Sequence, residues 1–301
     1  MILIFSTEKD HTTNEVIKWL VVKKKKFIRV HDSEIFEISV VNKSFFLKSS
    51  RNFFNVDDIT SVWFRRGGLK FCRNNYPIDS ISLIMEETQF LLEEYIIKTL
   101  ETKKHINKQS NNRTNKLLIL EKAKEIGLTV PEYFIATNTN DVKLHDTITK
   151  SISETIIVKS AFENFDGILY THVIEKKEKE SFFPTFFQRK IEKEFEIRSF
   201  YLNGKIWSCA IISQNDKQTQ IDYRLYNLEK PNRNVRYVLP KEIRDKISLL
   251  MEALDYNCGS IDIIKSIDGN FYFLEVNPIG QFLGISGFCN YLLEKEIADY
   301  L

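Results

Sequence analysis

The sequence has 301 residues and a net charge of +2, with 43% hydrophobic and 28% charged residues. These values are typical of a globular protein with two or three lobes, and they give no overall reason to expect nucleic acid as a partner. No apolar stretch approaches membrane-spanning length, the first residues lack the basic region of a signal peptide, and four scattered cysteines favour a reducing cytoplasm.

The first 105 residues alternate between strand and helix patterns. The predicted elements are strands at 2–5, 27–30 and 61–66 and helices at 14–22 and 83–100. This alternation predicts a small α/β lobe with a largely parallel sheet. The only charge run is the lysine run at 23–26, which indicates a solvated loop, with docking of an acidic peptide as the alternative.

The polar run at 103–114 has weak structure signals and marks a boundary. Beyond it, the predicted elements are a helix at 115–126, strands at 133–136, 155–159 and 169–174, long strands from 186 onward, and helices at 241–254 and 288–301. The stretch at 169–174 is predicted to return antiparallel to 155–159. No internal repeat is present.

The most informative stretch is a predicted β-hairpin over residues 259–277. An Asp-Gly dipeptide at 268–269 lies between two apolar runs and favours a tight two-residue turn. Counting back from that turn places Asp262 directly opposite Glu275, with Asn277 on the same face as Glu275. Opposed like charges destabilise a sheet, so a neutralising cation is expected. Mg²⁺ takes one or two carboxylates together with phosphate oxygens.

These three oxygen-bearing side chains therefore predict half of a nucleotide–metal site. The alternative is the wet face of a half-buried hairpin. Lys159 is a second candidate, because it closes an apolar strand and is placed to meet phosphate as a point charge. Taken alone, a lysine in this position is more often a solubilising residue at a strand end, and the loop that follows has only one glycine and matches no glycine-rich phosphate cradle.

Residues 186–198 indicate an apolar strand, an irregular link and a second strand. The link could offer free backbone groups and the Gln188 amide to a planar base, while Glu194 could accept from ribose hydroxyls. The alternative is an ordinary connection with surface ion pairs. Arg198 lies on the second strand, and Arg224 is a further cation whose partner cannot be inferred from spacing.

The order of these residues along the chain is itself a pattern. Its members are Lys116 at the start of a helix, Lys159, Gln188, Ile191, Glu194-x-Glu196-Ile197-Arg198, Asp222-Tyr223-Arg224, Asp262 and Glu275-Val276-Asn277-Pro278. This pattern resembles the ATP-grasp ligases over essentially the whole chain. The graspetide maturases, which are the microviridin-type and grasp-with-spasm peptide ligases, are further resembled in four runs: Trp63 to Gly68, Glu196-Ile197-Arg198, Asp222-Tyr223-Arg224 and Asn277 to Phe282. The overall resemblance is greatest to the grasp-with-spasm maturases.

The resemblance implies an α/β (α+β) fold in three parts. They are an N-terminal α/β domain at 1–105, a central ATP-grasp lobe at 106–187 and a C-terminal lobe at 188–301, with ATP clamped between the last two. The residues it assigns to ATP are Lys116 and Lys159 for the phosphates, Gln188 with the backbone at Lys190 and Ile191 for adenine, and Glu194 for ribose. The residues it assigns to Mg²⁺, with two ions, are Asp262, Glu275 and Asn277.

Four arginines complete the implied site. Arg198 and Arg224 would lie at the γ-phosphate and at the incoming carboxylate. Arg65 and Arg66 are candidates for substrate contact, with a structural ion pair as the alternative. Tyr223, before Arg224, stands where relatives often carry tryptophan, and this departure concerns packing more than chemistry.

The implied reaction is peptide macrocyclisation. An Asp or Glu carboxylate of a ribosomally made precursor, which has a leader and an acidic, Thr-rich core, would attack the γ-phosphorus and give an acyl phosphate and ADP. A Thr or Ser hydroxyl, or a Lys amine, would then form an ω-ester or ω-amide. Relatives suggest a homodimer. The alternatives are an amino-acid ligase of the same fold, which appends glutamate or joins a dipeptide, and a peptide-binding relative without turnover.

Overall fold

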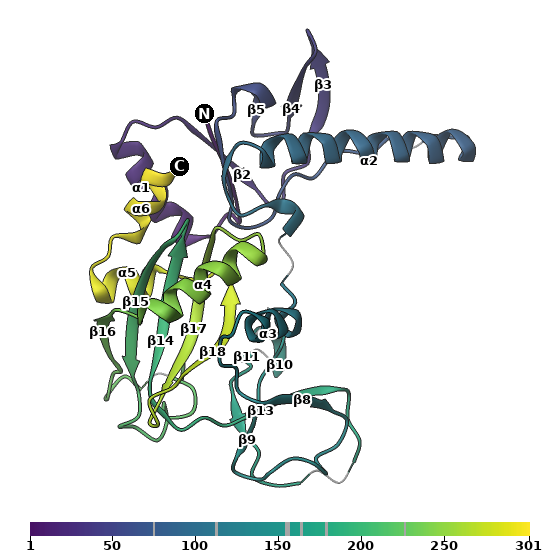
Figure 1. Cartoon of the computed structure of the whole chain (residues 1–301). Helices are drawn as coiled ribbons and strands as arrows, with labels where there is room; N and C mark the ends of the chain where they lie inside the picture. The colour runs from purple at the N-terminus through teal and green to yellow at the C-terminus, as the bar shows by residue number, and fades with distance from the viewer. Residues whose placement is uncertain (75, 112–113, 154–156, 163–164, 178–179, 226) are drawn as a thin grey trace.

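The computed structural model describes residues 1–74, 76–111, 114–153, 157–162, 165–177, 180–225 and 227–301, and it leaves the side chains of 157–162 and 165–168 undescribed. Figure 1 shows an N-terminal lobe above a large sheet, with a smaller lobe beside the lower end of that sheet. No helix in the described part of the chain has the length and apolar character needed to cross a membrane.

The N-terminal lobe is built on a four-stranded sheet in the order β2-β1-β6-β7, in which every pair is parallel. This confirms the predicted parallel sheet. Its elements are β1 (Ile2–Ser6), α1 (His11–Val22), β2 (Phe27–His31), β6 (Ser61–Phe64), α2 (Asp79–Glu101) and β7 (Lys104–Ile106). Helix α1 begins three residues before the predicted start, because the Asp10 carboxylate caps it by accepting from the Thr12 amide.

A second, three-stranded sheet of this lobe was missed by the sequence patterns. It consists of β3 (Glu37–Val41), β4 (Ser44–Lys48) and β5 (Phe53–Asn55), and the short helix η1 (Val56–Asp58) follows it. The turn between β3 and β4 uses Asn42 and Lys43, both at positive φ (50° and 68°). Because this turn contains no glycine, the usual sequence signal for a hairpin is absent.

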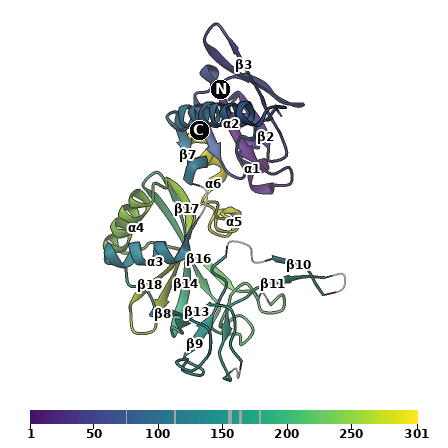
Figure 2. The same ribbon diagram turned by 90° about the vertical axis from the view of Figure 1, so that its right-hand side faces the viewer.

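The smaller lobe has a four-stranded sheet in the order β12-β9-β13-β8 and a separate strand pair, β10-β11. Its elements are α3 (Lys116–Glu125), β8 (Tyr133–Ala136), β9 (Thr147–Thr149), β10 (Ile157–Phe162), β11 (Phe165–Ile168), β12 (His172–Val173) and β13 (Thr185–Arg189). The short helix η2 (Gln109–Asn111) precedes them and contacts α2 of the N-terminal lobe. The prediction that 169–174 returns against 155–159 is wrong. Strand β11 makes that return, and β12 pairs with β9 instead. In Figure 2 the β10-β11 pair projects from the rest of the lobe.

The large sheet is antiparallel, in the order β16-β15-β14-β17-β18. Its elements are β14 (Lys193–Leu202), β15 (Lys205–Ile212), β16 (Arg233–Tyr237), α4 (Lys241–Ala253), β17 (Cys258–Ser266), β18 (Phe271–Asn277), α5 (Leu283–Cys289) and α6 (Leu293–Tyr300). The single helix predicted at 288–301 is wrong. Asn290 and Leu292 adopt left-handed backbone conformations there (φ 50° and 55°), and these separate α5 from α6.

The two faces of the large sheet are covered differently. Residues of α3 and α4, including Leu120 and Leu250, form one buried cluster with Ile197 and Ile263 on one face. On the other face, α5, α6 and α1 cover only the end that carries Phe200. The rest of that second face remains available for a site.

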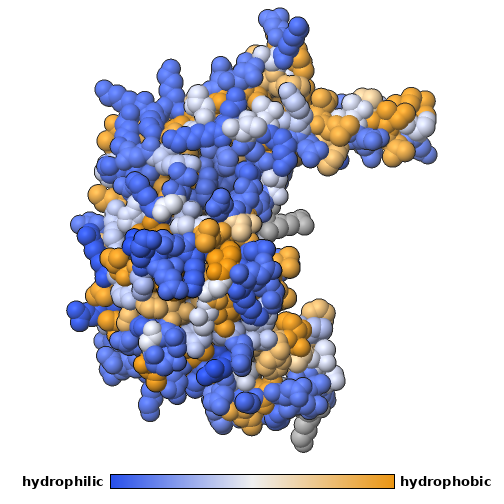
Figure 3. Space-filling view, in the orientation of Figure 1, coloured by the Kyte–Doolittle hydropathy of each residue, from blue (hydrophilic) through white to orange (hydrophobic). Residues whose placement is uncertain are grey.

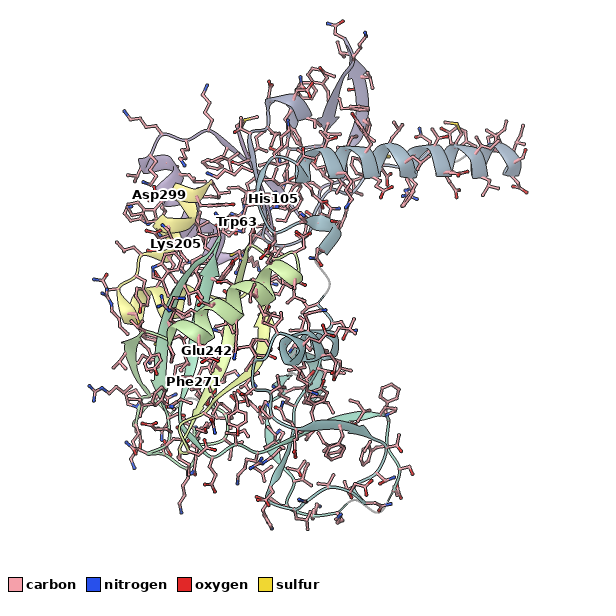
Figure 4. All side chains as sticks on the ribbon, viewed as in Figure 1. Trp63, His105, Lys205, Glu242, Phe271 and Asp299 are labelled. Atoms are coloured by element: carbon pink, nitrogen blue, oxygen red, sulfur yellow. The ribbon has the colours of Figure 1, made fainter. Side chains whose placement is uncertain are left out.

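The C-terminal segment joins the large sheet to the N-terminal lobe. Helix α6 packs on α1, where Lys23 of the lysine run forms an ion pair with Asp299. The Ser61 hydroxyl donates to the Leu301 carbonyl at 2.9 Å. Figure 4 labels Asp299 on α6 and Trp63 on β6, and Trp63 belongs to the same buried cluster as α6. The C-terminal end of the chain thus packs against the N-terminal lobe. The predicted domain boundaries at 105 and 187 fall within strands β7 and β13.

Candidate nucleotide and metal site

The predicted pairing of Asp262 with Glu275 is present, although the turn that predicted it is not. The loop holds three residues, 267–269, because the Ser266 amide donates to the Asn270 carbonyl and Gly269 takes a positive φ of 88°. That loop alone would set Asp262 opposite Leu274. A bulge shifts the register, so that Ile263 pairs with Phe273 while Asp262 pairs with Glu275.

The bulge aligns three charged residues in one row across the sheet. Arg198 on β14 pairs with Asp262 on β17, and Asp262 pairs with Glu275 on β18. Directly paired residues share a face of the sheet, so all three side chains rise from the incompletely covered face. An Arg198 guanidinium nitrogen lies 3.4 Å from either carboxylate oxygen of Asp262.

These side chains line a cavity of about 560 Å³. The predicted site residues that line it are Lys116, Arg198, Arg224, Asp262, Glu275 and Asn277. Other lining residues include Lys150, Leu169, Glu196, Cys209, Asp222, Tyr223, Gln281 and Phe288. The cavity is therefore lined by both charged and apolar side chains.

The two carboxylates of the cavity have unequal environments. Burial raises the pKa of Asp262; the charge of Arg198 opposes this rise, and the neighbouring Glu275 adds to it. Burial also disfavours ionised Glu275, but Lys150 and Lys116 outweigh it and lower the pKa of Glu275. The Lys116 amine lies 3.1 Å from a Glu275 oxygen, and the Glu275 side chain is 22% exposed. Lys116 and Lys150 thus keep the Glu275 carboxylate ionised, and an ionised carboxylate is also a ligand for a cation.

Lys150 is a cavity residue that the sequence patterns missed. It directly follows β9 (Thr147–Thr149) and lines the cavity. Burial lowers its pKa, and the nearby Lys116 acts in the same direction against the carboxylates of Glu275 and Asp262. The signal that could have found it is the one used for Lys159, since Thr147-Ile148-Thr149-Lys150 is also a short β-type run closed by a lysine.

Lys159 has a different place in the chain. It lies in β10, in the strand pair outside the four-stranded sheet of the smaller lobe. Its side chain is outside the described residues, so its predicted contact with phosphate stays a prediction.

Arg224 and Asp222 form a tight pair within the Asp-Tyr-Arg run. The Arg224 Nε donates to one Asp222 oxygen at 2.8 Å, and an Nη donates to the other. The side-chain bond to Asp222 raises the pKa of Arg224 against burial. The Tyr223 hydroxyl accepts a hydrogen bond of 3.1 Å from the Arg198 guanidinium. Burial raises the pKa of Tyr223 to about 12. The run thus holds both arginines at the cavity.

The residues predicted for adenine and ribose lie apart from the cavity lining. Gln188 is 1% exposed, and its side-chain nitrogen and oxygen have no hydrogen-bond partner among the described residues. A buried primary amide without partners is costly, which fits a polar, planar ligand such as a nucleobase. The Lys190 amide donates to the Asp146 carbonyl at 2.7 Å. Ile191 lies in the link before β14, and Glu194 lies at the start of β14.

Arg65 and Arg66 are not equivalent. Arg65 is 4% exposed, and its Nε lies 3.1 Å from the Asp10 carboxylate. It also donates to the Gly280 carbonyl at 3.2 Å and to Gln281 at 3.3 Å. Arg66 is more exposed, and its Nε lies 3.8 Å from Asp10. Arg65 therefore forms the structural ion pair that was given as the alternative to substrate contact. It also links the N-terminal lobe to the loop after β18.

The donor set at β17 and β18 fits a hard cation only in combination with another ligand. Among the described residues, no group of three or more His, Cys, Asp or Glu side chains could hold a metal by itself. Asp262, Glu275 and Asn277 offer two carboxylates and an amide at one cavity. Mg²⁺ prefers this incomplete oxygen set when phosphate oxygens and waters supply the remaining positions.

Comparison with solved structures decides the fold. A RiPP-associated ATP-grasp ligase of Chryseobacterium gregarium, solved with ADP and a leader and core peptide, superposes with a TM-score of 0.78 at 21% identity, covering 100% of this chain and 96% of that chain. The chain has the ATP-grasp fold.

Two other solved structures with this fold also extend over nearly all of the chain. The macrocyclase MdnC of Microcystis aeruginosa MRC, bound with precursor peptide MdnA, gives a TM-score of 0.75 at 21% identity, covering 100% and 98% of the two chains. D-alanyl-alanine synthetase A of Vibrio cholerae O1 gives a TM-score of 0.55 at 12% identity, covering 99% and 95%. No protein-family model and no curated protein sequence matches the chain.

Proposed function

We propose that this protein is an ATP-dependent, ADP-forming ligase that macrocyclises a ribosomally made precursor peptide. The observation that carries the proposal is the row Arg198–Asp262–Glu275, which opens into one cavity together with two lysines and Arg224. The fold supports it, since similar chains were solved with ADP and with leader, core or precursor peptides.

In this proposal the lysines bind the phosphates of the nucleotide, and the carboxylates bind its metal ion. Lys116 and Lys150 hold the phosphates as point charges, and Lys159 remains a candidate for the same role. Asp262, Glu275 and Asn277 hold Mg²⁺, with two ions expected, and Gln188 meets the adenine. Bound Mg²⁺ neutralises developing charge on the phosphate oxygens.

The peptide chemistry requires no covalent enzyme nucleophile. A side-chain carboxylate of the peptide attacks the γ-phosphorus, the bond to the β-phosphate oxygen breaks, and ADP leaves. A hydroxyl or amine of the same peptide then attacks the acyl carbon, loses its proton and releases phosphate. Arg198 and Arg224 stabilise the oxyanions of these steps. Holding both peptide groups together is worth roughly 7–11 kcal/mol in the best intramolecular cases.

Incubation with ATP, Mg²⁺ and acidic, Thr-containing peptides encoded near this chain tests the proposal. We expect ADP to form and the peptide to lose one water mass per ring. Glu275→Gln is the control that should release no ADP. A peptide mass that rises instead would indicate an amino-acid ligase of the same fold, and nucleotide binding with no ADP from any peptide would indicate a binding protein.

We also propose a cytoplasmic location. The free cysteines Cys72, Cys209, Cys258 and Cys289 support it, because three of them are buried and an oxidising compartment is not needed for this fold.

A further inference from the structure

Glu196 is a carboxylate of the cavity that none of the proposed roles uses. It lies on β14 two residues before Arg198, and side chains two apart on a strand point to the same face of the sheet. Both residues line the cavity. Figure 3 shows hydrophilic residues over most of one face of the molecule, whereas the side chains of Glu196 and Lys193 are only 14% and 8% exposed. Glu196 is therefore an acidic group shielded from bulk water beside the proposed site of reaction.

One carboxylate oxygen of Glu196 is occupied, and the other is not. The Lys193 ammonium group donates to Oε1 of Glu196 and also, at 3.0 Å, to the Ile221 carbonyl. In the part of the chain that the structure describes, no group donates a hydrogen bond to Oε2 of Glu196. An ionised carboxylate accepts through both of its oxygens. Lys193 thus fixes the carboxylate through one oxygen and leaves the other available to a ligand in the cavity.

Three other carboxylates line the cavity among the described residues, and all three are engaged. Both oxygens of Asp222 accept hydrogen bonds from Arg224. Asp262 and Glu275 are the proposed ligands of Mg²⁺, and a carboxylate must be deprotonated to bind a metal ion. None of these three groups is therefore free to take up a proton during the reaction, and Glu196 is.

The second step of the proposed reaction requires a proton acceptor. The electron pair of the attacking oxygen or nitrogen forms a bond to the acyl carbon, and the bond from that carbon to the phosphate oxygen breaks. The attacking group must lose one proton, and the released phosphate can take one up. A side chain that carries out such a proton transfer contributes about 10²–10⁴-fold to the rate.

We propose that Glu196 is the general base of ring closure. Its Oε2 takes the proton of the attacking hydroxyl or amine, and this proton then passes to the released phosphate. Lys193 is a positioning residue, because it orients the carboxylate and does not touch the peptide. The proposal rests on the proposed ligase function and assigns the residue that handles its proton.

The groups around Glu196 suit this role. Burial raises the pKa of Glu196, and the charge and hydrogen bond of Lys193 oppose this rise. Asp222, in the loop after β15, and Asp262, on β17, add to it. The Tyr223 phenol also feels the charge of Glu196, which helps to raise the pKa of that phenol. A general base works best when its pKa lies near the operating pH, and a raised carboxylate pKa moves in that direction.

Glu196→Gln separates the two steps in a single-turnover experiment with ATP, Mg²⁺ and the acidic, Thr-containing peptide that the wild type macrocyclises. Glutamine keeps the shape of the side chain but cannot take up the proton. ADP should form in the first turnover at a rate close to that of the wild type, whereas ring closure should slow by about 100-fold or more. Added hydroxylamine should trap the accumulated acyl phosphate as a hydroxamate. The matched control is Glu192→Gln, an exposed glutamate just before β14, which should close rings like the wild type.

Two further variants keep the test independent of folding. Glu196→Gln leaves the buried Lys193 ammonium without its charged partner, and breaking a buried pair in this way is destabilising. The double variant Lys193→Met with Glu196→Gln removes both charges and should show the same separation of the two steps. Lys193→Met alone keeps the base. Because Lys193 lowers the pKa of Glu196, its loss should move the acid limb of the pH profile of ring closure to higher pH.

The outcomes distinguish this role from the ligase function itself. Ring closure by Glu196→Gln within about tenfold of the wild type would overturn the role of Glu196 as base. A first-turnover rate of ADP formation that falls as much as ring closure would also overturn it, because Glu196 would then act in phosphate transfer or in the fold. Both results leave the ligase function standing. A wild type that forms neither ADP nor a ring with any peptide would instead overturn the proposed function, and this role with it.

Discussion

Replacement of Arg65 by methionine separates a structural role from a role in substrate binding. Methionine keeps much of the side-chain volume but removes the guanidinium, which pairs with Asp10 at 3.1 Å and donates to the Gly280 carbonyl at 3.2 Å. Asp10 is 7% exposed, so its charge would remain in a site shielded from water. We expect the variant to be strongly destabilised.

The size of the destabilisation depends on which hydrogen bonds Asp10 and the Gly280 carbonyl retain in the variant. Breaking a buried ion pair by removing one partner costs about 3–5 kcal/mol. Asp10 still accepts from the Thr12 amide at 3.0 Å and from the Thr13 hydroxyl at 3.2 Å, which favours the lower end of that range. The Gly280 carbonyl loses its donor, and an unsatisfied buried acceptor costs about 1–3 kcal/mol. A loss of about 4 kcal/mol in the free energy of unfolding is therefore expected.

Urea unfolding followed by circular dichroism measures this loss. Arg66→Met is the matched control, because Arg66 is 39% exposed and lies 3.8 Å from Asp10, and exposed pairs contribute about 1 kcal/mol or less. If Arg65→Met unfolds within about 0.5 kcal/mol of the wild type yet loses ADP formation, the structural account is refuted and Arg65 contacts the substrate.

Three further predictions concern the site and the pH dependence of stability. Glu275→Gln should abolish ADP formation while the circular dichroism spectrum stays unchanged, and near-normal turnover would contradict the metal assignment. Lys150→Met should weaken ATP binding in calorimetry about tenfold or more, equivalent to at least 1.4 kcal/mol; an affinity equal to the wild type, with a loss in Lys159→Met instead, would reverse these roles. Burial favours protonated Glu34, but bonds from the His31 amide and from Ser49 and Asn52 outweigh it and lower its pKa. A lowered carboxylate pKa stabilises the fold above the unfolded-chain value of about 4.3, and this stability is lost as the pH falls through the folded value. Glu34→Gln should therefore lose less unfolding free energy than the wild type between neutral pH and acid, and an equal loss would contradict the assignment.

Local patterns predicted the parallel α/β sheet of the N-terminal lobe and the acidic pair, whereas the ATP-grasp fold came from the family resemblance. These patterns did not predict how the acidic pair arises. The apolar runs of β17 and β18 and the intervening Asp-Gly were sufficient to predict a hairpin. The actual three-residue turn would have separated Asp262 from Glu275, and a bulge restored their pairing. A bulge depends on how a strand fits its neighbours, and periodicity does not reveal it.

The features that the sequence did not predict all depend on distant parts of the chain. Lys150 follows a strand of only three residues, and only the order β12-β9-β13-β8 gives that strand a place beside the cavity. The contacts of Arg65 with Gly280 and Gln281 join segments more than two hundred residues apart. The β3-β4 hairpin lacked a glycine at its turn. Sequence spacing describes neighbours on one element, and these features depend on packing between elements.

A crystal structure with Mg²⁺ and a non-hydrolysable ATP analogue tests the central claim most directly. The account predicts an ion about 2.0–2.1 Å from oxygens of Asp262 and Glu275, bridging to phosphates that lie beside Lys116 and Lys150. A nucleotide bound elsewhere, or an ion that touches neither carboxylate, would contradict it.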